Sequence, residues 1–141
     1  MLPLRYPRRW RIAGGLLLAA VFAATLMPMV WFWEERRQLL SWLFDADKWL
    51  HTIVFAFLAL WFSGQYAKRD YWRIGLWLSV FGVAIELCQR MVAHRTAEWA
   101  DLAADVVGIV IGLAIAAFGV GGWSLHVEKW FGGAEADRAA P

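Results

Sequence analysis

Residues 101–125, DLAADVVGIVIGLAIAAFGVGGWSL, decide the fold because a charged start leads into a long apolar run. Everything after Asp105 in this stretch is uncharged and makes about 30 Å of helix, enough to cross the hydrocarbon core of a bilayer. Gly108 and Gly112 form a Gly-x-x-x-Gly pattern, which allows close helix packing in lipid. Asp101 and Asp105 share a helix face with these glycines. The stretch therefore predicts a transmembrane helix whose carboxylates face other helices.

Three further apolar segments precede this one. Residues 12–33 carry no charge, residues 49–67 are uncharged apart from His51, and the third segment is interrupted by Glu86. This third segment spans a bilayer only if Glu86 enters the membrane, because the apolar residues before it make only about 18 Å of helix. The chain of 141 residues is 61% hydrophobic, more than is usual for a soluble domain.

We therefore predict an all-α integral membrane protein, with four transmembrane helices in residues 1–123 and a tail in residues 124–141. The expected helices cover about 12–33, 49–67, 73–92 and 99–123. A cleaved signal peptide is the alternative for the first segment, but its apolar run exceeds the roughly 7–15 residues of a signal-peptide core. In the tail, apolar residues at helical spacing predict a short interfacial helix, with disorder after Gly133.

The positive charges indicate the orientation of the bundle. Most Lys and Arg residues lie before the first helix, between the second and third helices, or in the tail. These residues are Arg5, Arg8, Arg9, Arg11, Lys68, Arg69, Arg73, Lys129 and Arg138. Both termini are therefore expected in the cytoplasm.

Composition also excludes some functions. The net charge of +2 comes without a basic stripe interleaved with aromatic residues, so no nucleic-acid partner is expected. Cys88 is the single cysteine of the sequence, which excludes an intrachain disulfide and a Cys-x-x-Cys motif. We expect no cofactor.

Ionisable residues gather where the second, third and fourth helices reach the predicted outer side. Glu86 lies about 9 Å inside its helix end, where an unpaired carboxylate costs a few kcal/mol and is a functional candidate. A polar site near the outer face is therefore predicted. Its candidate residues are Asp47, Lys48, His51, Glu86, Gln89, Arg90, Arg95, Asp101 and Asp105.

A purely structural interpretation of these residues stays open. Glu86 and Arg90 are four residues apart and would neutralise each other on one helix face. Asp101 and Asp105 would be acids of a first turn, favoured by the helix dipole.

His51 would be a general base, a proton-responsive group or a metal ligand, with Asp47 orienting its ring. Glu86, Asp101 and Asp105 would complete a set of metal ligands. The sequence lacks a His-x-x-x-His motif or a cysteine pair, so we expect no metal.

The order and spacing of these residues resemble the VanZ-like family. The likeness covers roughly residues 12–120 and rests on Asp47-Lys48-x-x-His51, Glu86-x-x-Gln89, Arg95, Asp101, Asp105, Gly108 and Gly112. Two positions depart from the pattern: Asp105 stands where many members have asparagine, and Thr52 stands where an aromatic residue commonly follows the histidine.

The resemblance implies a multi-pass protein of the bacterial inner membrane, in a family named for a protein linked to resistance to teicoplanin, a lipid-bearing glycopeptide. Together with the polar site beside an apolar bundle, the resemblance leads us to expect a membrane lipid as the partner, such as a lipid-linked cell-wall intermediate. The added charge of Asp105 argues against a simple transfer of the antibiotic-resistance role.

Three functions remain open from the sequence. The favoured one is an envelope protein whose polar site binds an amphiphile, such as a lipid-linked envelope intermediate or a lipidated antibiotic. The second is an integral-membrane enzyme acting on a lipid phosphate headgroup, with His51 and carboxylates as acid and base. The third, a proton-coupled transporter or an ion pathway, is least favoured because the first two helices lack charged residues in their inner halves.

Overall fold

The computed structural model describes residues 1–26, 44–93 and 99–138, and every regular element in these ranges is helical. The long helices are α1 (Pro7–Leu26), α3 (Phe44–Ser63), α4 (Tyr71–Ala93), α5 (Trp99–Ile115) and α6 (Trp123–Arg138). A 3-10 helix, η2 (Lys68–Asp70), leads into α4, and a π-helical turn, η3 (Ala116–Val120), continues α5. The prediction of an all-helical fold is confirmed.

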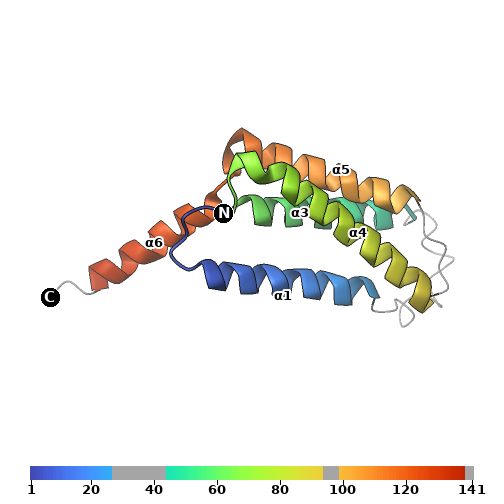
Figure 1. Ribbon diagram of the computed structural model, residues 1–141, viewed down its shortest axis with the longest axis horizontal. Helices are drawn as coiled ribbons and strands as arrows, with labels where there is room; N and C mark the ends of the chain where they lie inside the picture. The colour runs from blue at the N-terminus through green and yellow to red at the C-terminus, as the bar shows by residue number, and fades with distance from the viewer. Residues whose placement is uncertain (27–43, 94–98, 139–141) are drawn as a thin grey trace.

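Helices α1, α3, α4 and α5 lie side by side, and each runs antiparallel to the one before it (Figure 1). Helix α5 packs mainly on α3 and also contacts α4, while α1 contacts α4. The starts of α3 and α5 lie at the same end of the bundle as the end of α4 (Figure 1). The N-terminus and α6 lie at the opposite end, where α6 leaves the bundle.

The outward faces of α4 and α5 are apolar. Trp77 on α4 is 71% exposed, and Phe118 on η3 is 92% exposed. Lys68–Met91 and Trp99–Val120 are long and apolar enough to cross a membrane, and only 33% of each apolar window is buried. The core helix of a soluble protein would be mostly buried, so this exposure supports a membrane protein. The apolar part of α3, Lys48–Ser63, is shorter.

Glycines bring α5 close to α3. A Cβ atom added at Gly108 would collide with the backbone oxygen of Thr52, and one added at Gly112 would collide with the backbone oxygen of Ala56. Thr52 also donates a hydrogen bond from Oγ1 to the carbonyl oxygen of Ala104, at 3.2 Å. The backbones of α3 and α5 are thus in contact, as the Gly-x-x-x-Gly pattern predicts.

The apolar core lies directly beneath the polar residues. Phe55 and Leu58 of α3, Ile85 of α4 and Ile109 of α5 are almost completely buried. Ile85 immediately precedes Glu86, so the same turn of α4 contributes to both the core and the polar cluster.

Helices α1 and α3 each begin five residues earlier than predicted, and residues 27–33 of the predicted first helix lie outside the described residues. The bounds near the C-terminus differ as well. The expected continuous helix to residue 123 changes to a π-helical turn after Ile115. Gly119 and Gly122 have positive φ values of 152° and 76°, which favour glycine and interrupt the helix before α6 begins. The tail is helical as predicted, but α6 continues to Arg138, so the disorder predicted after Gly133 is wrong for residues 134–138.

Candidate polar site between three helices

A buried hydrogen bond joins α3 to α5. Nδ1 of His51 lies 2.8 Å from Oδ1 of Asp105. The exposed fractions are 7% for His51 and 1% for Asp105. The helix contact explains this pairing, since Gly108 places α5 against the carbonyl of Thr52, next to His51. The expected partner of the ring was Asp47 on the same helix, whereas the observed partner of Nδ1 comes from another helix.

Helix α4 packs against the carboxylate of Asp105. A Cβ atom at Gly82 would lie 2.5 Å from Oδ2 of Asp105 and 3.3 Å from Phe55. Oδ2 has no hydrogen-bond partner among the described residues. The side chain of Asp105 is therefore held between α3 and α4, with one oxygen on His51 and the other against the glycine.

Glu86 and Asp101 meet His51 at this end of the bundle. His51, Glu86 and Asp101 each offer one nitrogen or oxygen atom, and these atoms all lie within 4.8 Å of one another. All three side chains are buried, and each comes from a different helix. Together with Asp105 they form what we call the acidic cluster: His51, Glu86, Asp101 and Asp105.

The acidic cluster has an excess of negative groups. It contains three carboxyl groups and one imidazole, so it is net negative whenever all three carboxyl groups are ionised. Burying several like charges together in an apolar bundle is costly. Such a site favours protons, a cation, or a ligand that brings several hydrogen-bond donors.

Other predicted site residues lie around the cluster or point elsewhere. Gln89 donates from Nε2 to the backbone oxygen of Thr25, at 3.0 Å, and so joins α4 to the end of α1. Lys48 is half-buried, and Arg90 is exposed. The ion pairs between described side chains are His51–Asp105 and Arg73–Asp70, and neither includes Arg90. The proposed pairing of Arg90 with Glu86 therefore has no support in this part of the chain.

Two predicted residues cannot be placed. The backbone of Asp47 belongs to the first turn of α3, but its side chain lies outside the described residues. Arg95 lies wholly outside them.

A carboxylate that the sequence did not single out holds the opposite end together. Glu128 on α6 accepts hydrogen bonds from the backbone N–H groups of Arg5 and Tyr6, at 2.6 and 3.0 Å. It also accepts one from the indole Nε1 of Trp10, at 2.9 Å. No local motif reveals this contact, because each partner lies more than a hundred residues before Glu128 in the chain.

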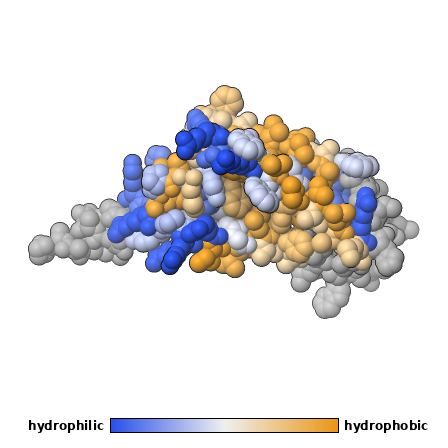
Figure 2. Space-filling model, viewed as in Figure 1, coloured by the Kyte–Doolittle hydropathy of each residue, from blue (hydrophilic) through white to orange (hydrophobic). Residues whose placement is uncertain are grey.

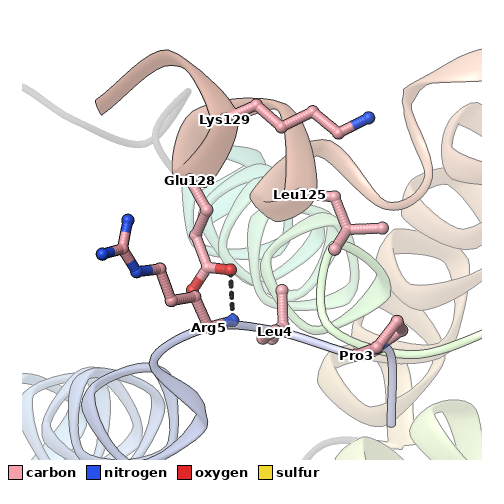
Figure 3. Close-up of a pocket in the computed structure, with 6 residues that line it drawn as sticks. All are labelled: Pro3, Leu4, Arg5, Leu125, Glu128 and Lys129. Carbon is pink, nitrogen blue, oxygen red and sulfur yellow. Dashed lines mark hydrogen bonds between the residues drawn. The ribbon is translucent and has the colours of Figure 1, made fainter. Parts of the chain in front are cut away.

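These hydrogen bonds lower the pKa of Glu128. Partial burial acts to raise its pKa, but the hydrogen bonds from Arg5, Tyr6 and Trp10, together with the charge of Arg5, outweigh burial and lower the pKa. The carboxylate borders a pocket of about 540 Å³ between the N-terminal stretch and α6, with Lys129 on its rim (Figure 3). The pocket lies at the end opposite the acidic cluster.

Comparison of the sequence with family models places the chain in a family. The sequence model described as VanZ/LLP1 matches residues 6–120. The chain belongs to the VanZ/LLP1 family. No curated protein and no solved structure matches the chain.

The VanZ/LLP1 match covers α1, α3, α4, α5 and η3, and so includes the whole acidic cluster. Helix α6 and Glu128 lie beyond it. Membership of the VanZ/LLP1 family, together with two apolar helices of spanning length, supports a membrane protein of the cell envelope.

Proposed function

We propose that this protein crosses the bacterial inner membrane four times, through α1, α3, α4 and α5, with both termini in the cytoplasm. Its surface supports this topology: apolar residues cover much of the visible face of the bundle, and hydrophilic residues gather where α6 diverges (Figure 2). Basic residues of the N-terminus and of η2 meet at that end, where Lys68 donates to the backbone oxygen of Ala117, at 2.7 Å. The positive-inside rule assigns this basic end to the cytoplasm.

We further propose that the acidic cluster, at the outer end of the bundle, binds the headgroup of an amphiphile. The proposal rests on the buried side chains of His51, Glu86 and Asp101, which each place one nitrogen or oxygen atom within 4.8 Å of the other two. These side chains come from three helices whose outer faces are apolar. An amphiphile matches both features, because its tail lies along the apolar helices while its polar head reaches the cluster.

The charge of the cluster narrows the class of amphiphile. Carboxylates accept hydrogen bonds from hydroxyl and ammonium groups, which sugar-bearing envelope intermediates and amine-bearing lipidated antibiotics carry. A bare phosphate is disfavoured beside three carboxyl groups unless a cation lies between them. A glycosylated or amine-bearing headgroup is therefore the proposed ligand.

Native mass spectrometry of the full chain tests this proposal. Wild type, Glu86→Gln and the control Glu128→Gln would each be titrated with a lipid-linked sugar intermediate and with a lipidated glycopeptide. The expected result is binding that falls about tenfold or more in Glu86→Gln, as loss of a charged hydrogen bond of about 1.5–3 kcal/mol implies, and that is unchanged in Glu128→Gln. Equal binding by all three proteins would reject the cluster as the headgroup site.

A second candidate function rests on the His51–Asp105 hydrogen bond. A carboxylate on one ring nitrogen orients the imidazole for proton transfer at the other, as general acid–base catalysis requires. In this alternative, the protein is an integral-membrane enzyme acting on a lipid phosphate headgroup. Phosphate release from prenyl or glycerol phosphates would be compared between wild type and His51→Ala, and equal rates would exclude the histidine from such a reaction.

A further inference from the structure

The donor set of the acidic cluster is that of a metal centre as well as that of a headgroup site. One imidazole nitrogen and two carboxylate oxygens, from His51, Glu86 and Asp101, lie within 4.8 Å of one another. A divalent ion about 2.0–2.2 Å from each donor holds its ligand atoms roughly 3–3.5 Å apart, so the three ligand atoms need to approach one another by up to about 1–2 Å.

A second feature of the cluster, the hydrogen bond between His51 and Asp105, also fits a bound metal. A metal-binding histidine almost always donates its second ring N–H to a carboxylate or carbonyl, which fixes the tautomer and raises the basicity of the ring. Oδ1 of Asp105 lies 2.8 Å from Nδ1 of His51, buried between α3 and α5. With Nδ1 bound to Asp105, a metal would be held through Nε2.

The charge of Asp105 fits a bound metal ion as well. An ionised carboxylate accepts the ring N–H more strongly than a neutral amide does. Its second oxygen, Oδ2, is buried against Gly82 and has no hydrogen-bond partner among the described residues. A positive charge next to the imidazole compensates this buried carboxylate.

We propose that His51, Glu86 and Asp101 bind one divalent transition-metal ion, with Asp105 as the residue that positions His51. Mixed nitrogen and oxygen donors suit Zn²⁺ and Mn²⁺. Three protein ligands leave a coordination position for water or a ligand oxygen, as in open metal sites. The ion offsets the negative charge of the cluster and gives it an affinity for anionic oxygens.

This inference deepens the proposed function, because a bound cation adds phosphate-bearing amphiphiles to the ligands the cluster accepts. Only the biological role of the bound metal depends on the proposed function. Metal binding is measured without lipid, so either proposal can fail while the other holds.

The test uses the full chain, purified in detergent and treated with a chelator. Zn²⁺ and Mn²⁺ are added separately, unbound ion is removed by gel filtration, and bound metal is counted by inductively coupled plasma mass spectrometry. The wild type is expected to retain about one ion per chain. Glu86→Gln and Asp101→Asn are expected to bind at least tenfold more weakly, and Asp105→Asn about 10- to 100-fold more weakly.

Glu128→Gln is the matched control, because it removes a carboxylate at the opposite end of the molecule and is expected to retain metal like the wild type. Circular dichroism and gel-filtration profiles identify any variant that fails to fold, and the remaining variants then carry the comparison. Retention well below one ion per chain by the wild type overturns the proposal. Equal affinity in wild type and in both folded ligand variants overturns it as well.

Discussion

Gly82 of α4 lies directly against the carboxylate of Asp105 on α5: a Cβ atom at position 82 would come within 2.5 Å of Oδ2. The acidic cluster thus depends on the absence of a side chain on the neighbouring helix. This contact couples the packing of the bundle to the geometry of the site.

Replacing Gly82 by alanine is therefore expected to displace Asp105 and to lower the free energy of unfolding by about 1–3 kcal/mol. Unfolding of the purified protein in mixed detergent micelles measures this change. Gly15→Ala is the control, because nothing lies within 4 Å of a Cβ there. Equal stability of the two variants would contradict the contact.

Gly108→Ala is expected to separate α3 from α5, because the added Cβ meets the rigid backbone of Thr52. The expected loss of unfolding free energy is again about 1–3 kcal/mol. Gly75→Ala provides the comparison, since its Cβ would make only ordinary contacts of 3.5 Å or more. A Gly108→Ala protein as stable as Gly75→Ala would refute the close approach of the two helices.

The His51–Asp105 pair is expected to show strong energetic coupling. A double-mutant cycle of His51→Ala and Asp105→Ala should give a coupling of about 1–3 kcal/mol, because the two buried groups are each other's hydrogen-bond partners. The Arg73–Asp70 pair is the reference, with Arg73 63% exposed and a distance of 3.5 Å. Its coupling should stay below about 0.5 kcal/mol, and similar values for both pairs would contradict the buried bond.

Acid is expected to release the N-terminal stretch from α6. Because the folded state lowers the pKa of Glu128 below its ordinary value of 4.5, the carboxylate contributes stability above about that pH, and this contribution is lost as the pH falls through the folded pKa. Hydrogen-exchange protection of the Arg5 and Tyr6 amides should therefore decrease in acid. In Glu128→Gln, protection should be weaker near neutral pH and lack this acid step; an identical profile would exclude the carboxylate as its cause.

The sequence predicts the architecture well where one helix carries its own signal. The spacing of Asp101, Asp105, Gly108 and Gly112 places all four on one face, and all four are buried against neighbouring helices. The apolar run of α5 and the helical spacing of the tail are equally local. Such features depend only on helix periodicity.

Relationships between helices could not be predicted in the same way. The carboxylate that bonds Nδ1 of His51 is determined by the offset of α5 along α3. Contact between Gly108 and the Thr52 backbone fixes this offset. Gln89 lies only about 60° around α4 from Glu86, yet that rotation directs it to Thr25 of α1. The hydrogen-bond partners of Glu128 lie near the other end of the chain, so no local pattern predicts them.

A structure of the full chain in lipid nanodiscs, with native lipid retained, tests directly whether the acidic cluster binds a headgroup. Headgroup density is expected between α3, α4 and α5, in contact with His51, Glu86 and Asp101. Lipid bound only along the outer faces of the helices, with these three side chains contacting only protein, would contradict it.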